Sequence, residues 1–204
     1  MDAHAQLPAS PWVARFAPLV PSGEVLDLAC GSGRHAHLFA RLGHPVLALD
    51  RDPEALARLA AENGVCPHFE NGDRPHFGAL RTMCFDLERS TDAADWPFEP
   101  GRFAGIVVTN YLHRPLLPKI VQALRPDGIL IYETFAAGNE RFGKPSNPAF
   151  LLEEGELLRL PLRVIAYESG QSPLPKPAMV QRLCASGPAF GREKAILAAE
   201  WCQE

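Results

Sequence analysis

The stretch Glu24–Ala36, EVLDLACGSGRHA, decides the fold. Its apolar run ends around Asp27, and the glycines Gly31 and Gly33 follow within a few residues. Glycine adopts backbone conformations that a Cβ would block, and it lets a ligand approach the main chain closely. In parallel α/β sheets, ligands lie beyond the carboxyl ends of the strands, where the strand order switches. The stretch therefore predicts a first strand that leads into a turn for a nucleotide-like ligand.

Apolar runs alternate with helical patterns along the rest of the chain. Strands are expected at residues 24–28, 45–49, 81–85, 103–109, 129–132, 163–167 and 180–185, and helices at 11–19, 34–42, 53–63, 116–124 and 148–158. Asp52 is the expected N-cap of the 53–63 helix. Strands separated by helices imply parallel crossovers, whereas the last two strands, joined by a proline-rich connector, suggest an antiparallel pair at one edge. The prediction is a single doubly wound α/β domain over residues 1–204, with an N-terminal helical segment at 1–20, a mainly parallel sheet and helices on both faces.

The composition is typical of one globular domain. Of the 204 residues, 47% are hydrophobic and 22% charged, and the net charge is −4, so no basic surplus points to DNA or RNA as a partner. The five cysteines are an odd number without repeated spacing, and no basic start followed by an apolar run precedes them. Reduced thiols in the cytoplasm are therefore expected. No stretch approaches the roughly 18 uninterrupted apolar residues of a membrane span, so no membrane partner is expected.

Two carboxylates limit the identity of the ligand. Asp50 ends the second strand about twenty residues after the turn, where it can accept hydrogen bonds from both ribose hydroxyls of a dinucleotide or of a methyl donor. Asp27 would repel a dinucleotide pyrophosphate. It could instead favour the positive amino and sulfonium groups of S-adenosylmethionine, directly or through water. The alternative is a generic nucleotide turn in which Asp27 caps the loop.

The residues around both carboxylates resemble a known superfamily. EVLDLACGSGRHA followed by PVLALDRDPEAL is similar to motifs I and II of the class I S-adenosylmethionine-dependent methyltransferases, and the similarity extends over roughly residues 21–130. Within that superfamily the chain looks most like the small bacterial tellurite-resistance-type methyltransferases. The resemblance implies S-adenosylmethionine as the cofactor and a Rossmann-like sheet of seven strands whose last strand is antiparallel.

The resemblance also implies a set of cofactor contacts. Asp27, Gly31 and Gly33 would contact the methionine part, Asp50 the ribose, and Asp86 with the Leu87 backbone the adenine. Asp86 could equally form a turn at a strand end, His35 could either approach the cofactor carboxylate or pack on its helix, and Arg51 could point to solvent or cover the adenine. The candidate cofactor-binding residues are Asp27, Ala29, Gly31, Gly33, His35, Asp50, Arg51, Asp86, Leu87 and Asn110.

A polar cluster after the fourth strand is the candidate acceptor site. Asn110 can hold an amine or the acceptor, Tyr111 can form an aromatic wall, His113 titrates near neutrality, and Arg114 could pair with an anionic substrate. The motif of amino-methyltransferases, Asn or Asp with two prolines and an aromatic residue, is only partly matched, because Tyr111 and Leu112 replace the prolines. This departure puts methylation of a base or amide nitrogen in doubt. His113 could alternatively cap the following helix.

A second acceptor surface is expected in the loop at residues 136–150. Its glycines and prolines surround Asn139, Arg141, Lys144 and Asn147, a composition that suits a shaped and moving lid. Asn139 and Arg141 are accordingly candidate acceptor-site residues, and an ordinary surface loop is the alternative.

The segment at residues 65–80 has no clear period and is expected to be a loop. Cys66 and His68, together with His76 and Cys84, match no zinc-binding spacing, so no metal site is expected.

The predicted function is methyl transfer from S-adenosylmethionine to a small-molecule acceptor. Methylation of RNA or protein ranks lower, because no recognition domain is visible and the charge is slightly acidic. A cofactor-binding module without catalysis is a further alternative, and a nicotinamide oxidoreductase is disfavoured by Asp27. A metalloid acceptor such as tellurite is suggested by the resemblance alone.

Overall fold

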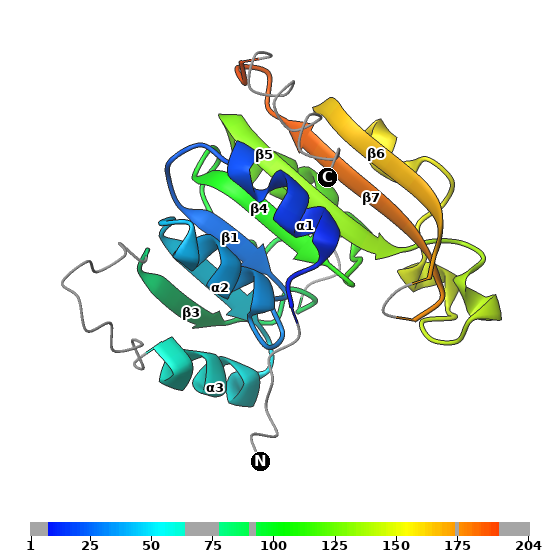
Figure 1. Ribbon diagram of the computed structural model, residues 1–204, viewed down its shortest axis with the longest axis horizontal. Helices are drawn as coiled ribbons and strands as arrows, with labels where there is room; N and C mark the ends of the chain where they lie inside the picture. The colour runs from blue at the N-terminus through cyan, green and yellow to red at the C-terminus, as the bar shows by residue number, and fades with distance from the viewer. Residues whose placement is uncertain (1–7, 64–77, 90–92, 174–175, 192–204) are drawn as a thin grey trace, which may run out of the picture.

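The computed structural model describes residues 8–63, 78–89, 93–173 and 176–191. Within them, one seven-stranded sheet has the order β3-β2-β1-β4-β5-β7-β6 (Figure 1). β1 to β5 run parallel, whereas β7 is antiparallel to both β5 and β6. The predicted Rossmann-like sheet, mainly parallel with antiparallel pairing at its last strand, is confirmed. The strands are β1 (Val25–Leu28), β2 (Val46–Asp50), β3 (Leu80–Cys84), β4 (Phe103–Thr109), β5 (Leu124–Phe135), β6 (Arg163–Ser172) and β7 (Ala178–Ser186).

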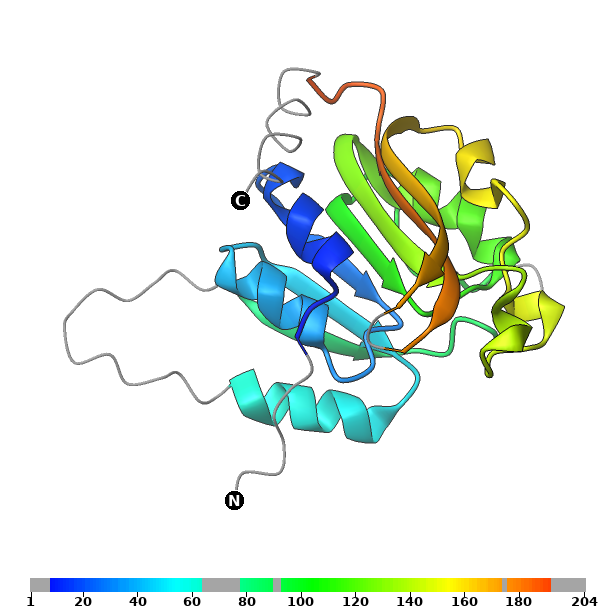
Figure 2. The same cartoon turned by 45° about the vertical axis from the view of Figure 1, so that its right-hand side comes forward.

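Helices cover both faces of this sheet, as Figures 1 and 2 show for α1 and α2 on one side. Successive residues of a strand point to opposite faces. Val107 of β4 accordingly joins a buried cluster with Trp12 of α1 and Phe39 of α2. Val108, the next residue, joins the second cluster with Ile120 of α4. The helices are α1 (Pro11–Phe16), α2 (Arg34–Arg41), α3 (Pro53–Asn63) and α4 (Leu117–Ala123), with 3-10 helices η1 (Ala17–Leu19), η2 (Arg114–Leu116), η3 (Asn139–Arg141), η4 (Pro148–Phe150) and η5 (Glu156–Arg159).

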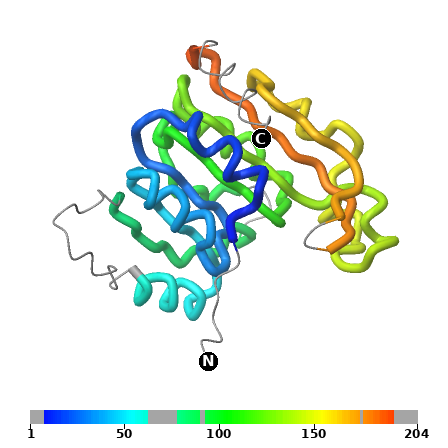
Figure 3. Tube along the Cα trace, in the orientation of Figure 1, coloured from blue at the N-terminus to red at the C-terminus, as the bar shows by residue number. Residues whose placement is uncertain are grey.

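The carboxyl ends of the parallel strands meet at one edge of the sheet, and this edge carries the candidate site. In the tube view, the chain before α1 begins beside this edge, and the hairpin of β6 and β7 reaches the same edge from the far side of β5 (Figure 3). The Ser10 hydroxyl donates to both oxygens of the Glu133 carboxylate in β5, at 3.1 and 3.0 Å. The N-terminal segment is thus fixed at the edge where the ligand is expected.

Several predicted boundaries need correction. The expected 11–19 helix is α-helical only to Phe16 and continues as a 3-10 helix. The last two strands are longer than expected, and β5 already begins at Leu124, which was assigned to the preceding helix. The predicted N-cap is confirmed, because Asp52 Oδ1 accepts from the Glu54 and Ala55 amides at 2.9 and 3.2 Å. Most of the expected 65–80 loop lies outside the described residues.

The expected helix at 148–158 is wrong. Two short 3-10 helices, η4 and η5, replace it, with Leu151 in an extended conformation after the first and Gly155 at φ 64° before the second. Leu152 forms an isolated bridge with Ala136 and is fully buried. The leucines of this segment are therefore buried singly against the sheet and do not form one face of a helix.

The turn after β1 is fixed by close packing. Gly33 has φ 76°, and a Cβ at this position would lie 2.5 Å from Leu59 Cδ1 of α3. Gly31 has a similar φ of 53°, but a Cβ there would meet no atom within 4 Å. The first glycine therefore faces open space, whereas the second allows the turn to pack against α3.

Gly33→Ala should lower the free energy of unfolding by about 3 kcal/mol, because left-handed strain and the clash with Leu59 add. Gly31→Ala is the matched control and should cost about 1 kcal/mol, since it adds strain without a clash. Urea unfolding followed by circular dichroism measures both. In a Leu59→Ala background the two substitutions should become equal in cost. Equal costs in the wild-type background would contradict the packing argument.

Candidate active site

A buried carboxylate joins the end of β1 to the start of α2. Asp27 is 1% exposed, and its Oδ2 accepts a hydrogen bond from the Ala36 amide at 2.8 Å. The N-cap position of α2 is Gly33, which has no side chain to cap the helix. Asp27 therefore supplies the missing cap from the neighbouring strand. Burial raises the pKa of Asp27 to about 7, although the amide hydrogen bond opposes this shift.

Asp50 links the end of β2 to the glycine turn. Its Oδ2 accepts from the Gly31 amide at 2.7 Å, and its Oδ1 accepts from the Asp52 amide at 3.0 Å. Ala29, just before the turn, has a left-handed φ of 55°. The turn thus presents its main chain and the Asp50 carboxylate together at the carboxyl edge of the sheet.

The end of β3 lies beside the end of β2. Asp50 pairs with Cys84 in the ladder, and the Phe85 amide donates to the Asp50 carbonyl at 2.9 Å. Asp86 follows, and its Oδ1 accepts from the Glu88 amide at 2.9 Å, so the carboxylate forms a strand-end turn. Leu87 is buried, and Arg51 is exposed on the adjacent strand end. Because adjacent strands lie about 4.8 Å apart, all of these residues border one edge.

His35 is packed inside the protein. It is 1% exposed, and its Nε2 accepts from the Ser10 amide at 3.1 Å. The other nitrogen, Nδ1, lies 3.5 Å from Thr109 Oγ1. Burial lowers the pKa of His35 to about 3, so the ring is neutral. Both ring nitrogens are therefore engaged by the protein, and the residue fastens the N-terminal segment to α2 and β4.

The chain turns sharply after β4. Asn110 is exposed and has a left-handed φ of 55°, and its amide donates to the Glu133 carbonyl at 2.9 Å. The Tyr132 hydroxyl donates to the Tyr111 carbonyl at 2.9 Å. Burial, followed by the nearby Glu88 carboxylate, raises the pKa of the Tyr111 hydroxyl. This buried hydroxyl lies close to the Glu88 and Asp86 carboxylates that follow β3. Tyr111 therefore lies toward the β3 end of the site.

Arg114 has a different role from the one its sequence position suggested. Its Nε and Nη2 each donate to the Glu156 carboxylate at 2.8 Å. Nη1 and Nη2 also donate to the carbonyls of Ala149 and Leu151, at 2.9 and 2.8 Å. The guanidinium thus joins the loop after β4 to the segment between β5 and β6. His113 Nε2, next to it in sequence, is buried without a partner in the described chain.

The predicted lid loop is organised around Asn139. This side chain is buried, donates from Nδ2 to the Pro145 carbonyl at 2.9 Å, and accepts at Oδ1 from the Met179 amide at 3.1 Å. Arg141 is exposed and lies over the Phe142 ring, 5.6 Å from its centroid. The structure thus brings Asn139 into the scaffold of the loop and leaves Arg141 on its surface.

One ion-pair network was missed in the sequence. Arg182 of β7 donates from Nε to Glu133 at 2.7 Å and from Nη1 to Glu168 of β6 at 3.2 Å. The register aligns Thr109, Glu133, Arg182 and Glu168 in one row across four strands. The available signal was a charged residue within each apolar strand, Glu133 in ILIYETF and Arg182 in MVQRLCAS.

Neither a metal cluster nor a membrane span stands out in the part of the chain that the structure describes. No group of three or more His, Cys, Asp or Glu side chains there could hold a metal ion. Cys66, His68 and His76 lie outside it. Among the same residues, no helix has the length and apolar character to cross a bilayer.

The fold and the site together define a class of protein. A glycine turn after β1, with acidic residues at the ends of β1 and β2 and after β3, in a sheet of this strand order, is the arrangement of S-adenosylmethionine-dependent methyltransferases. Residues 1–171 match the family described as methyltransferase domain, and the chain belongs to that family.

Two relatives share part of this sequence. Ribosomal protein L11 methyltransferase of Thermus thermophilus is 38% identical over 112 residues, which is 54% of this chain and 37% of that protein. Malonyl-[acyl-carrier protein] O-methyltransferase of Pectobacterium atrosepticum is 29% identical over 128 residues, 61% of this chain and 45% of that protein. These matches therefore span less than half the length of each relative.

Solved structures share the fold at low identity. TehB from Haemophilus influenzae superposes with a TM-score of 0.66 at 17% identity, over 86% of this chain and 61% of that one. A TehB-like methyltransferase from Corynebacterium glutamicum gives 0.58 at 21% identity, over 91% of each chain. The architecture resembles that of TehB.

Arg114→Ala should lower the free energy of unfolding by about 3 kcal/mol, because it leaves the largely buried Glu156 carboxylate without its partner. The matched control is Arg159→Ala. Arg159 pairs with Glu153 at 3.3 Å on an exposed surface, so its loss should cost less than about 1 kcal/mol. Chemical unfolding of both variants measures the difference. Similar costs for the two would contradict a structural role for Arg114.

Proposed function

We propose that this chain, as one domain over residues 1–204, transfers a methyl group from S-adenosylmethionine to a small-molecule acceptor. The observation that carries the proposal is the meeting of the Gly31 amide and the Asp50 carboxylate, 2.7 Å apart, at the carboxyl edge of the sheet. A Cβ at Gly31 would meet no atom within 4 Å, so the turn offers open space for a ligand against its main chain. The residues present therefore fit the cofactor.

Each candidate residue has a distinct task in this proposal. Asp27 favours the positive amino group, Asp50 accepts from the ribose hydroxyls, and Asp86 with the Leu87 backbone holds the adenine. Arg51 covers the adenine from the strand end. When bound, S-adenosylmethionine supplies a methyl group on a positively charged sulfur, which leaves as a neutral thioether when a nucleophile attacks in line.

The protein's contribution to the reaction is positioning. Holding the nucleophile in line and excluding water supply most of the acceleration in such transfers. Asn110 is exposed beside the glycine turn, and Tyr111 and His113 place two buried polar atoms in the same loop. We assign this loop to the acceptor, with residues 136–150 as its outer wall. A protonated nucleophile passes its proton to water or to His113.

A macromolecular acceptor is the second candidate. It is favoured by the two named relatives, of which one acts on a ribosomal protein and the other on a carrier-bound malonyl group. Incubation with methyl-labelled donor and a cell extract separates the candidates, because label in the fraction below 1 kDa supports the small molecule. Label confined to protein or to nuclease-sensitive material would support the alternative.

Asp50→Ala should weaken the binding of S-adenosylmethionine and of S-adenosylhomocysteine at least tenfold, about 1.4 kcal/mol, because the ribose hydroxyls lose their acceptor. Titration calorimetry measures both ligands. Asp52→Asn is the matched control, since it removes a neighbouring charge but preserves helix capping. The affinity of Asp52→Asn for both ligands should stay within twofold of that of the wild-type protein. Wild-type protein that binds neither ligand would end the proposal.

Binding of S-adenosylmethionine should strengthen several-fold as the pH rises from 5.5 to 7.5. Burial raises the folded-state pKa of Asp27 to about 7, so the carboxyl group is neutral in acid and attracts the amino group only as it ionises. The cofactor amino group stays largely protonated over this range, because α-amino pKa values lie near about 8. Asp27→Asn should flatten the profile. Calorimetry at four pH values tests this, and binding that weakens with rising pH would contradict it.

A further inference from the structure

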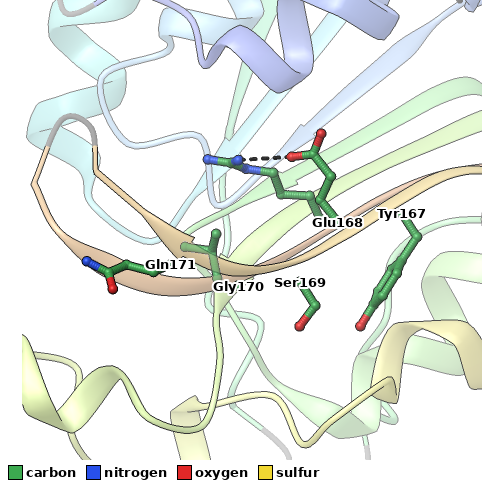
Figure 4. Close-up of a pocket in the computed structure, with 7 residues that line it drawn as sticks. Tyr167, Glu168, Ser169, Gly170 and Gln171 are labelled. Carbon is green, nitrogen blue, oxygen red and sulfur yellow. Dashed lines mark hydrogen bonds and ion pairs between the residues drawn. The ribbon is translucent and has the colours of Figure 1, made fainter.

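A groove of about 420 Å³ lies on the β6–β7 hairpin, outside the residues assigned so far (Figure 4). Residues 167–171 of β6 line it together with Val180 and Arg182 of β7. The close-up shows Glu168 directed to one side of the hairpin, with its ion pair drawn, and Tyr167 and Ser169 directed to the other. The lining is therefore mainly polar.

The register relates this groove to the acceptor loop. Glu133 pairs with Arg182, which pairs with Glu168, and Thr109 pairs with Glu133 on the other side. Two of the groove residues, Arg182 and Glu168, thus belong to the row that begins at Thr109, immediately before Asn110. With about 4.8 Å between strands, β6 lies roughly 10 Å from β5 and 14 Å from β4. The groove is close enough to hold the far end of an acceptor whose reacting end lies at Asn110.

The groove remains open because its floor is main chain. Gly170 has φ 155°, and a Cβ there would meet no atom within 4 Å. Val180 lies opposite Gly170 in the ladder and is partly exposed. A larger residue at Val180 would therefore extend over Gly170 into the groove.

The charges of the groove select the chemistry of its ligand. Arg182 is the only cation among the seven lining residues, all of them described, and it is committed to Glu133, Glu168 and the Ser172 hydroxyl at 2.7 to 3.2 Å. The Glu168 side chain is 48% exposed and is paired with Arg182 at 3.2 Å and with Arg15 of α1 at 3.8 Å, whereas Tyr167 and Ser169 are directed to the other side of the hairpin. Among its lining residues the groove thus offers the remaining acceptor capacity of the half-exposed Glu168 carboxylate and no uncommitted cation, which suits hydroxyl or amino groups better than an anion.

We propose that the groove binds the hydroxyl- or amino-bearing far end of an elongated acceptor whose nucleophile lies beside Asn110. This inference rests on the proposed function and names its substrate class. A small inorganic oxyanion could not span the distance from β4 to β6, and the committed Arg182 would not bind it.

The test is affinity selection with the full chain. Protein saturated with S-adenosylhomocysteine is incubated with the fraction of a bacterial metabolite extract below 1 kDa, and mass spectrometry identifies the retained compounds. Val180→Trp fills the groove, and Glu168→Gln removes its exposed charge without changing its shape. Val164→Trp is the matched control, because Val164 lies in β6 of the same hairpin, is 48% exposed and does not line the groove.

Wild type and Val164→Trp should retain a compound rich in hydroxyl or amino groups, and Val180→Trp and Glu168→Gln should retain at least tenfold less. Equal retention by all four proteins would overturn the inference, as would no retention by the wild type or retention of an inorganic anion alone. If Val180→Trp does not fold, Glu168→Gln decides the result. Calorimetry with S-adenosylhomocysteine tests the proposed function separately. Should that binding be absent, selection without the nucleoside still tests the groove.

Discussion

The hydrogen bond from the Ala36 amide to the Asp27 carboxylate, 2.8 Å long, is the contact on which the cofactor side depends. It holds the turn between β1 and α2, and that turn sets the position of Gly31 relative to Asp50. A serine or asparagine cap would do the same with less desolvation. Capping a helix with a carboxylate that is 1% exposed costs desolvation free energy, as its pKa of about 7, raised by burial, indicates. The proposed function accounts for this cost, because the positive amino group of the cofactor would pair with the Asp27 carboxylate and offset its desolvation.

The N-terminal segment joins the cofactor side to the acceptor side. Ser10 donates from its amide to His35 of α2 and from its hydroxyl to Glu133 of β5. Glu133 also binds Arg182, so one residue before α1 connects the glycine-turn helix to the β7 strand. Because burial lowers the pKa of His35 to about 3, the ring stays neutral and keeps accepting from the Ser10 amide at neutral and mildly acidic pH. The two sides of the site thus share one polar network.

Local sequence predicted the backbone features around the glycine turn well, because each signal lies within a few residues of the structural feature it determines. The glycines, the carboxylates at the strand ends and the Asp52 cap are of this kind. The acceptor side depends on contacts between distant residues: Arg114 meets Glu156 42 positions later, and Ser10 meets Glu133 123 positions later. The periodic pattern of apolar residues in a sequence carries no information about contacts between residues so far apart in the chain. For the same reason the 148–158 segment was predicted to be a helix, whereas its leucines are buried one by one against the sheet.

The pairing of the acceptor-side cations limits what the site can recognise. Arg114 follows His113 in the acceptor loop, and Arg182 pairs with Glu133 beside it. Arg114 donates two hydrogen bonds to Glu156, and Arg182 donates to both Glu133 and Glu168. Releasing either one for a substrate anion would leave Glu156 or Glu133 unpaired, and a buried unpaired carboxylate costs several kcal/mol. The interaction with a substrate anion would have to offset this free-energy cost before it contributed any net affinity. Hydrogen-bond donors on the acceptor carry a smaller penalty, because the Glu168 carboxylate is half exposed and can accept further bonds while its ion pairs with Arg182 and Arg15 remain. The pairing of Arg114 and Arg182 therefore supports the proposal of an uncharged or cationic polar acceptor, within a fold that resembles that of TehB.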